Sequence, residues 1–308
     1  MTSSVGTFKR ITHVASTVNF SGLWIPLITP FRDNAIDHPA LAGLVRQLAA
    51  QGVAGFVVCG STGEAAALCE AEQLAVLDTV RQHAGGLPLL MGLSGYHLPK
   101  TLAWVETLST QALAGLLVSA PCYIRPSQDG LLHWFETIAQ ASAVPLVLYD
   151  IPYRTGAMLQ RDTLLRLAGH RNIAAIKDCG GDAGKTAALL ADGRLQVLAG
   201  EDLHIFSTVA AGGAGAIAAS AHLHTARFAS VVRLLRDGKL EPARALWSGL
   251  PALIDALFAE PNPAPLKALL AHQGLLRNEL RRPMMEASAD ALERLVRLHD
   301  ALGPLSRA

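Results

Sequence analysis

Cysteine is scarce in this sequence and its spacing forms no recognisable set. The four cysteines, Cys59, Cys69, Cys122 and Cys179, contain no CxxC pair. This pattern excludes a disulfide framework and a cysteine-rich zinc site of the usual spacing. It is typical of reduced thiols, so the sequence predicts a cytoplasmic protein.

Blocks of one charge and long apolar runs are also missing. The 26 Lys and Arg residues against 25 Asp and Glu residues leave a net charge of +1, so neither nucleic acid nor an anionic membrane is a predicted partner. No apolar run approaches the ~18 residues of a membrane span. Residues 1–20 lack the apolar core and cleavage site of a signal peptide. We predict a small-molecule partner, and an N-terminal extension over residues 1–20 that is either loose or an oligomer arm.

Short apolar runs alternate with segments of helical period along most of the chain. A content of 51% hydrophobic and 17% charged residues is enough for a full core. Runs rich in Val, Ile and Leu predict strands at residues 23–29, 55–59, 88–92, 115–119, 145–149, 173–177, 195–199 and 214–218. Helices are predicted at residues 39–51, 71–84, 99–112, 129–141, 160–168, 182–191, 202–211 and 222–237.

Eight such units predict a (β/α)₈ TIM barrel, an α/β fold, over residues 21–239. A doubly wound open sheet is the alternative, but it has fewer strands and often a glycine-rich first turn, where this chain has Thr29-Pro30-Phe31. After residue 240 only helical patterns remain, interrupted by a proline-rich stretch at 260–265. We interpret residues 240–308 as a C-terminal helical region packed on the barrel.

Several predicted helices begin with a recognisable residue. Pro39 and Pro99 suit the first helical turn, while Asp129, Asp182 and Asp202 can cap free backbone N–H groups.

Barrel enzymes carry their chemistry at the C-terminal ends of the strands. Of the six lysines, Lys177 alone ends an apolar strand run, and burial there can make a lysine neutral and nucleophilic toward a carbonyl. The alternative is a structural lysine paired with Asp178 or Glu201. Tyr149 ends the preceding strand, either as a proton relay or as a buried tyrosine. The turn at residues 60–64, GSTGE, offers free N–H groups to a carboxylate.

Six motifs in order complete this set of strand ends. They are Gly60 to Glu64 (GSTGE), Pro121 to Gly130 (PCYIRPSQDG), Tyr149 to Gly156 (YDIPYRTG), Ile176-Lys177-Asp178, Gly200-Glu201-Asp202 and Glu260 to Pro263 (EPNP). Together they resemble the dihydrodipicolinate synthase and N-acetylneuraminate lyase superfamily of Schiff-base barrel enzymes, nearest to its synthase branch. The resemblance covers roughly residues 23–283.

The resemblance implies that Lys177 condenses with the ketone of pyruvate to give an imine. The imine becomes an enamine, which attacks an aldehyde. Tyr149 and Ser61 match the residues that relay protons, and Tyr123 matches a tyrosine that completes a neighbouring site across a dimer interface. Thr62 and the adjacent N–H groups match the site of the pyruvate carboxylate.

Further positions follow from the same resemblance. Gly200 and Ile217 match positions that shape the pocket, although barrel packing alone also explains them. Arg154 matches the arginine with which synthases hold the carboxylate of the aldehyde, and a guanidinium suits that grip. The resemblance implies a homo-oligomer, a dimer or tetramer, with no cofactor and no metal.

The second substrate separates the candidate functions. Arg154 favours condensation of pyruvate with L-aspartate semialdehyde to 4-hydroxy-tetrahydrodipicolinate, a step of lysine and diaminopimelate biosynthesis. Ser61, a form common in lyases, and Asp150, in place of the usual asparagine, favour the alternative, a lyase or dehydratase of a 2-keto-3-deoxy sugar acid or N-acetylneuraminate. A keto-acid-binding protein without turnover is a third reading. A metal-dependent aldolase is disfavoured because the strand ends supply no cluster of His and carboxylate ligands.

The family's lysine-feedback pocket looks altered in this sequence. Tyr96, Lys100 and Glu70 occupy positions where lysine-sensitive relatives carry an asparagine, a glutamate and a histidine. Since the cation of Lys100 would repel a lysine ammonium, we predict that L-lysine does not inhibit the protein.

Overall fold

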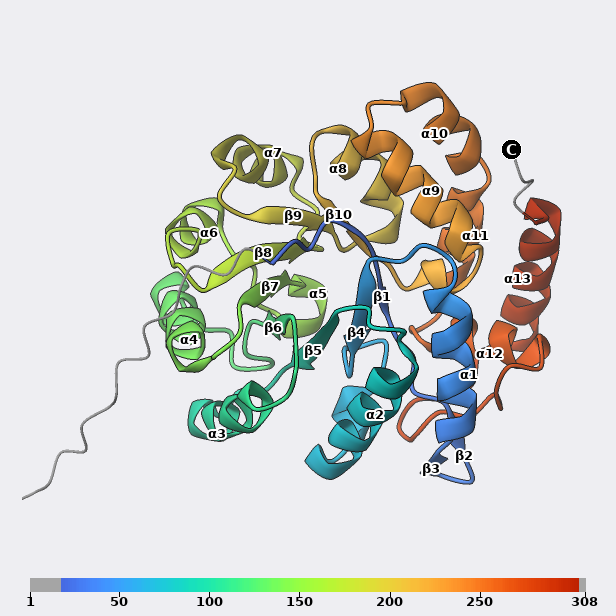
Figure 1. The fold of residues 1–308 in the computed structure, drawn as a ribbon, viewed down its shortest axis with the longest axis horizontal. Coiled ribbons are helices and arrows are strands. Elements are labelled where there is room, and N and C mark those ends of the chain that lie inside the picture. The colour runs from blue at the N-terminus through green and yellow to red at the C-terminus, as the bar shows by residue number, and fades with distance from the viewer. Residues whose placement is uncertain (1–17, 305–308) are drawn as a thin grey trace, which may run out of the picture.

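Eight parallel strands close into a barrel in a computed structural model that describes residues 18–304 (Figure 1). The strands are β1 (Gly22–Pro26), β4 (Gly55–Val58), β5 (Leu89–Leu93), β6 (Gly115–Ser119), β7 (Leu146–Asp150), β8 (Ile173–Asp178), β9 (Gln196–Ala199) and β10 (Gly215–Ile217). They follow the chain order around the barrel, and β10 closes it against β1. The predicted (β/α)₈ fold is confirmed.

Helices surround the barrel on its outer side (Figure 1). They are α1 (His38–Ala49), α2 (Glu70–His83), α3 (Leu98–Ser109), α4 (Gln128–Ala141), α6 (Arg161–Leu167), α7 (Ala183–Asp192), α8 (Ile205–Ala210) and α9 (Thr225–Arg236). The short helix α5 (Pro152–Thr155), in contrast, lies in the middle of the ring in Figure 1. The chain also forms short 3₁₀ turns, η1 (Ala65–Ala67), η2 (Asp202–His204) and η3 (Ser220–His222). Within the described residues, no helix is both long and apolar enough to cross a membrane.

The predicted helix starts hold only in part. Pro39 and Pro99 lie in the first turns of α1 and α3, and Asp182 caps α7 by accepting a hydrogen bond from the Lys185 amide at 3.0 Å. The predictions for the other two aspartates are wrong. Asp129 lies inside the first turn of α4, which Ser127 caps. Asp202 is buried, and its carboxylate accepts instead from the Ser220 amide at 2.7 Å.

The barrel interior is filled by side chains from all eight strands. One cluster of buried residues contains Trp24, Val57, Leu90, Leu117, Val147, Ala175, Leu198 and Ile217, one from each strand. This is the packed interior expected of a TIM barrel. Residues 1–17 of the predicted N-terminal extension lie outside the described residues, but Phe20 is fully buried in the same cluster and packs against Trp24.

The first strand differs from its prediction. It ends at Pro26, three residues before the expected Thr29, and a small antiparallel hairpin follows, β2 (Phe31–Arg32) with β3 (Ala35–Ile36). Its turn residues, Asp33 and Asn34, have φ of 54° and 65°, as a two-residue hairpin turn of type I′ requires. Strands of two residues have no periodicity that a sequence pattern could reveal.

Four helices follow the barrel in the described part of the chain. They are α10 (Leu240–Trp247), α11 (Leu250–Leu257), α12 (Ala264–His272) and α13 (Ala289–Leu302), drawn in orange to red on one side of the barrel in Figure 1. The predicted boundary at residue 240 falls between α9 and α10. These helices share the large core cluster that lies between the sheet and the helices, through residues such as Leu253, Leu269 and Leu295.

Candidate active site

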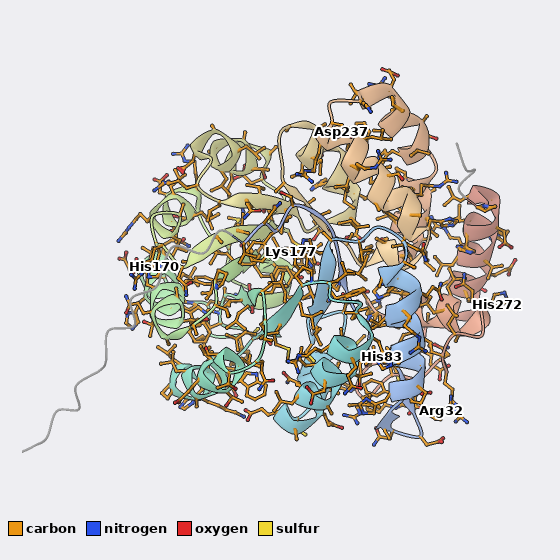
Figure 2. The ribbon with its side chains drawn as sticks, viewed as in Figure 1. Arg32, His83, His170, Lys177, Asp237 and His272 are labelled. Atoms are coloured by element: carbon orange, nitrogen blue, oxygen red, sulfur yellow. The ribbon has the colours of Figure 1, made fainter. Side chains whose placement is uncertain are left out.

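Lys177 and Tyr149 meet at the C-terminal end of the barrel. They lie on neighbouring strands β8 and β7 and pair in register. The Lys177 Nζ is 3.3 Å from the Tyr149 hydroxyl and 4.4 Å from the centre of its ring, and both side chains are buried. Figure 2 places Lys177 in the middle of the ring of elements, away from peripheral residues such as His170 and Asp237. The geometry therefore joins an amine and a phenol where barrel enzymes carry their chemistry.

The surroundings of Tyr149 keep its phenol protonated. Burial, assisted by the nearby Cys179, raises the pKa of Tyr149 well above its usual value, although a hydrogen bond with Ser61 and the charge of Arg154 oppose the shift. A neutral phenol at this place can donate a proton and then recover it. Tyr149 is thus hydrogen-bonded to the Lys177 amine and has Ser61, in the turn after β4, as a neighbour.

The turn after β4 presents unused backbone donors. The amides of Gly63 and Glu64 bond back to Gly60 and Ser61 at 3.0 and 3.2 Å. The amides of Ser61 and Thr62 donate to no acceptor in the described part of the chain. Two adjacent backbone N–H groups without an acceptor can bind an anion such as a carboxylate.

The C-terminal region holds this turn in place. Asn262 Nδ2 donates to the Thr62 hydroxyl at 3.0 Å, and Thr62 is buried. Lys267 of α12 is fully buried and forms an ion pair with Glu64, whose φ is 53°. The Lys267 ammonium also donates to the Glu279 carbonyl at 2.9 Å. We missed Asn262 and Lys267 as site residues from sequence; the EPNP motif was the available signal for the first.

A cavity of about 420 Å³ opens above Tyr149. It is lined by Ser61, Tyr149 and Arg154 from the predicted set, and by Asn262 and residues 281–284 from the C-terminal region. Arg154, at the end of β7 on α5, is exposed and forms no ion pair with any residue from 18 to 304. Its guanidinium is therefore free to bind an anion in the cavity.

Gly200 follows β9 and leaves space beside the amine. A Cβ at this position would lie 2.4 Å from the Cys179 Sγ and 2.8 Å from the Lys177 Cγ. A side chain here would therefore displace Lys177. Ile217 is fully buried in the barrel interior, so the structure supports its packing role. Neither Gly200 nor Ile217 lines the cavity itself.

Comparisons with known proteins agree with this geometry. The profile of the Dihydrodipicolinate synthetase family matches residues 19–302. The chain belongs to this family. The 4-hydroxy-tetrahydrodipicolinate synthase 2 of Clostridium acetobutylicum is 36% identical over 282 residues, which cover 90% of this chain and 99% of that protein.

Solved structures of dihydrodipicolinate synthases superpose on the whole barrel. The enzyme from Thermotoga maritima is 30% identical with a TM-score of 0.87, covering 93% of this chain and 100% of its own. The enzyme from Acinetobacter baumannii, solved in complex with pyruvate, is 28% identical with a TM-score of 0.89, covering 92% and 99%. The resemblance stated from the six motifs is confirmed.

Within this dihydrodipicolinate synthetase fold, Tyr123 lies apart from the other predicted residues. It follows β6 with a φ of 74°, is 89% exposed and does not line the cavity of its own chain. Ile124 beside it is also exposed. Two adjacent apolar side chains that face outward from a strained turn are available to another molecule.

Ser119 is a cavity residue that the motifs did not indicate. It ends β6 in register with Tyr149, is buried, and its hydroxyl has no hydrogen-bond partner among residues 18–304. Buried polar groups are normally satisfied, so this hydroxyl is free for a bound molecule. Leu117 faces the barrel interior, and side chains alternate along a strand, so Ser119, two residues later, faces the interior as well. This alternation was the sequence signal that could have indicated Ser119.

The residues of the altered feedback pocket also come together in this family member. Glu70, Tyr96 and Lys100 line a second cavity, of about 770 Å³, between α2 and α3. The Lys100 ammonium lies 3.7 Å from the Glu70 carboxylate, and both are largely exposed. The cation predicted to repel lysine is therefore on the wall of this cavity.

Metal ligands are not grouped in the part of the chain that the structure describes. No three His, Cys, Asp or Glu side chains are arranged to hold a metal ion there.

Proposed function

We propose that the protein is a Schiff-base lyase that condenses pyruvate with L-aspartate semialdehyde to 4-hydroxy-tetrahydrodipicolinate. The contact of 3.3 Å between the Lys177 amine and the Tyr149 phenol carries this proposal, together with the cavity that Tyr149 and Arg154 line. Membership of the Dihydrodipicolinate synthetase family and the synthase names of relatives at 36% identity support it.

The first half of the reaction forms the imine. The Lys177 amine attacks the ketone carbon of pyruvate, and loss of one water from the carbinolamine gives a protonated imine. Tyr149 donates a proton to the departing hydroxyl and is reprotonated through Ser61. The free amides of the Ser61–Thr62 turn bind the pyruvate carboxylate and orient the ketone toward Lys177.

The second half joins the aldehyde. Loss of a proton from the methyl carbon turns the imine into an enamine, whose carbon attacks the aldehyde of the second substrate. Arg154 binds the carboxylate of that substrate in the cavity. The alkoxide that forms takes up a proton, and the amino group of the second substrate then attacks the imine carbon, which releases the Lys177 amine and closes the ring of 4-hydroxy-tetrahydrodipicolinate.

A second copy of the chain belongs to the proposal. The exposed Tyr123 and Ile124 support a homo-oligomer in which Tyr123 reaches the neighbouring site and joins the relay. The cytoplasmic location stays a prediction.

Borohydride reduction in the presence of pyruvate tests the proposal, followed by mass spectrometry of the peptides. We expect one reduced adduct, on the peptide that contains Lys177, and none in a Lys177→Met variant. An adduct elsewhere would overturn the mechanism. A panel of aldehydes then identifies the second substrate, with L-aspartate semialdehyde expected to be the best of them and the sugar-acid aldehydes poor.

A further inference from the structure

A buried lysine bridges the two residues that directly follow Tyr149 and Lys177. Those residues, Asp150 and Asp178, pair in register across β7 and β8. Lys185 of α7 forms an ion pair with Asp150, and its Nζ lies 3.6 Å from Asp178 Oδ1. All three side chains are buried. We call Asp150, Asp178 and Lys185 the strand-end clamp.

Every carboxylate oxygen of the clamp has a partner. Asp150 accepts from the Leu159 amide at 3.1 Å through Oδ1 and from Lys185 through Oδ2. Asp178 Oδ2 accepts from the Thr186 hydroxyl at 2.6 Å, and its Oδ1 accepts from the Gly180 amide at 3.0 Å. A fully bonded cluster has no free group for a ligand, so its role is structural organisation.

The backbone of Gly180 packs directly against the strand-end clamp. A Cβ at Gly180 would lie 2.0 Å from the Lys185 Nζ and 2.6 Å from Asp150 Oδ2. The loop backbone can therefore lie directly on the ammonium only because the residue is glycine. Burial by itself would lower the pKa of Lys185, but the hydrogen bond and charge of Asp150 outweigh burial and raise it, so the lysine stays charged.

The clamp and the reacting groups lie on opposite faces of the same two strand ends. Successive strand residues point to opposite faces; Tyr149 faces the barrel interior, and the clamp lies against α7. None of the three clamp residues lines the cavity above Tyr149. The negative charge of Asp150 is therefore paired with Lys185 and lies on the face of the strands away from the reacting groups.

We propose that Lys185 is a positioning residue that fixes the separation between the Tyr149 hydroxyl and the Lys177 amine by holding the ends of β7 and β8 together. This inference rests on the proposed function, since the separation matters for proton transfer during imine formation. A displacement of about 1 Å between reacting groups can cost on the order of 100-fold in rate.

The test compares Lys185→Met with the double variant Asp150→Asn/Lys185→Met. The single variant leaves the buried Asp150 without its ion-pair partner, which destabilises the fold. The double variant removes the whole Asp150–Lys185 pair and leaves Asp178 its bonds to Thr186 and Gly180, so it regains stability. We expect both variants to lose roughly 10- to 100-fold in kcat, while KM for pyruvate changes by less than about threefold because the carboxylate turn is untouched. Leu189→Ala, at a buried position of the same helix, is the control: it should lower the melting temperature with little effect on kcat.

The outcomes separate positioning from simple stability. If the double variant regains kcat together with stability, or if Leu189→Ala loses as much kcat as Lys185→Met, the proposal is wrong. A crystal structure of the double variant measures the effect of the clamp independently of activity. We expect the distance from the Lys177 Nζ to the Tyr149 hydroxyl to exceed 3.3 Å, and an unchanged distance would overturn the proposal. Failure of the wild-type protein to trap pyruvate on Lys177 would instead overturn the proposed function.

Discussion

Replacing Arg154 by alanine separates a synthase from a sugar-acid lyase. The guanidinium lines the cavity and has no ion pair within residues 18–304, so its removal leaves no buried charge behind. The guanidinium lies 5.8 Å from the ring centre of Tyr153, which is itself exposed. The Arg154→Ala variant should therefore fold normally and change the binding of an anion alone.

The magnitude follows from the contact that is lost. A hydrogen bond to a charged group contributes about 1.5–3 kcal/mol, and a fork-like grip on a carboxylate makes two. Because Arg154 is exposed, solvent screens the pair, and about 2–4 kcal/mol is a reasonable total. At about 1.4 kcal/mol for each factor of ten, kcat/KM for L-aspartate semialdehyde should fall roughly 30- to 700-fold.

A coupled assay of the condensation measures this loss, and borohydride trapping of pyruvate measures the first half-reaction separately. We expect trapping to remain within about twofold, since Arg154 acts after the imine has formed. The control is Arg161→Ala, an exposed arginine of α6 paired with Asp162. A loss below about threefold with L-aspartate semialdehyde, or an equal loss in trapping, would refute the assignment of Arg154.

Three further outcomes can be measured directly. L-lysine at millimolar concentration should leave the steady-state rate unchanged, because Lys100 and Glu70 line the altered pocket; potent inhibition would contradict this. Lys267→Met should lower the free energy of unfolding by about 3–5 kcal/mol, since it leaves Glu64 buried without its partner; urea titration would show it, and a change below about 1 kcal/mol would be against it. Burial lowers the pKa of His222 from 6.5 to about 4, so its contribution to stability is present above pH 6.5 and is lost as pH falls toward 4. His222→Gln should flatten this part of the stability profile, and an unchanged slope would refute the reasoning.

The barrel was predictable because its strands are buried on both faces. Such strands form continuous apolar runs that glycine and proline delimit, and all eight runs were found. The hairpin β2–β3 was not, since strands of two residues are set by their turn. Asp202 does not cap its helix because a contact with Ser220, 18 residues away, prevails over the local pattern.

The site was predictable where residues lie at strand ends in neighbouring strands, as Lys177 and Tyr149 do. Contacts between distant parts of the chain could not be read from the pattern. Asn262 meets Thr62 across 200 residues, and nothing local to either residue indicates the other. Lys185 and Lys267 lie in helices, where a lysine normally faces solvent, so their burial became evident only from the packing.

The contacts of Asn262 and Lys267 with the GSTGE turn have a consequence for synthesis of the chain on the ribosome. A nascent chain released up to residue 239 already contains Lys177, Tyr149 and Arg154. It still lacks Asn262 and Lys267, which fasten the carboxylate-binding turn. The enzyme therefore becomes competent late in its synthesis, and a nonsense mutation between codons 240 and 261 would leave a chain that contains the nucleophile but neither Asn262 nor Lys267 to hold the carboxylate-binding turn.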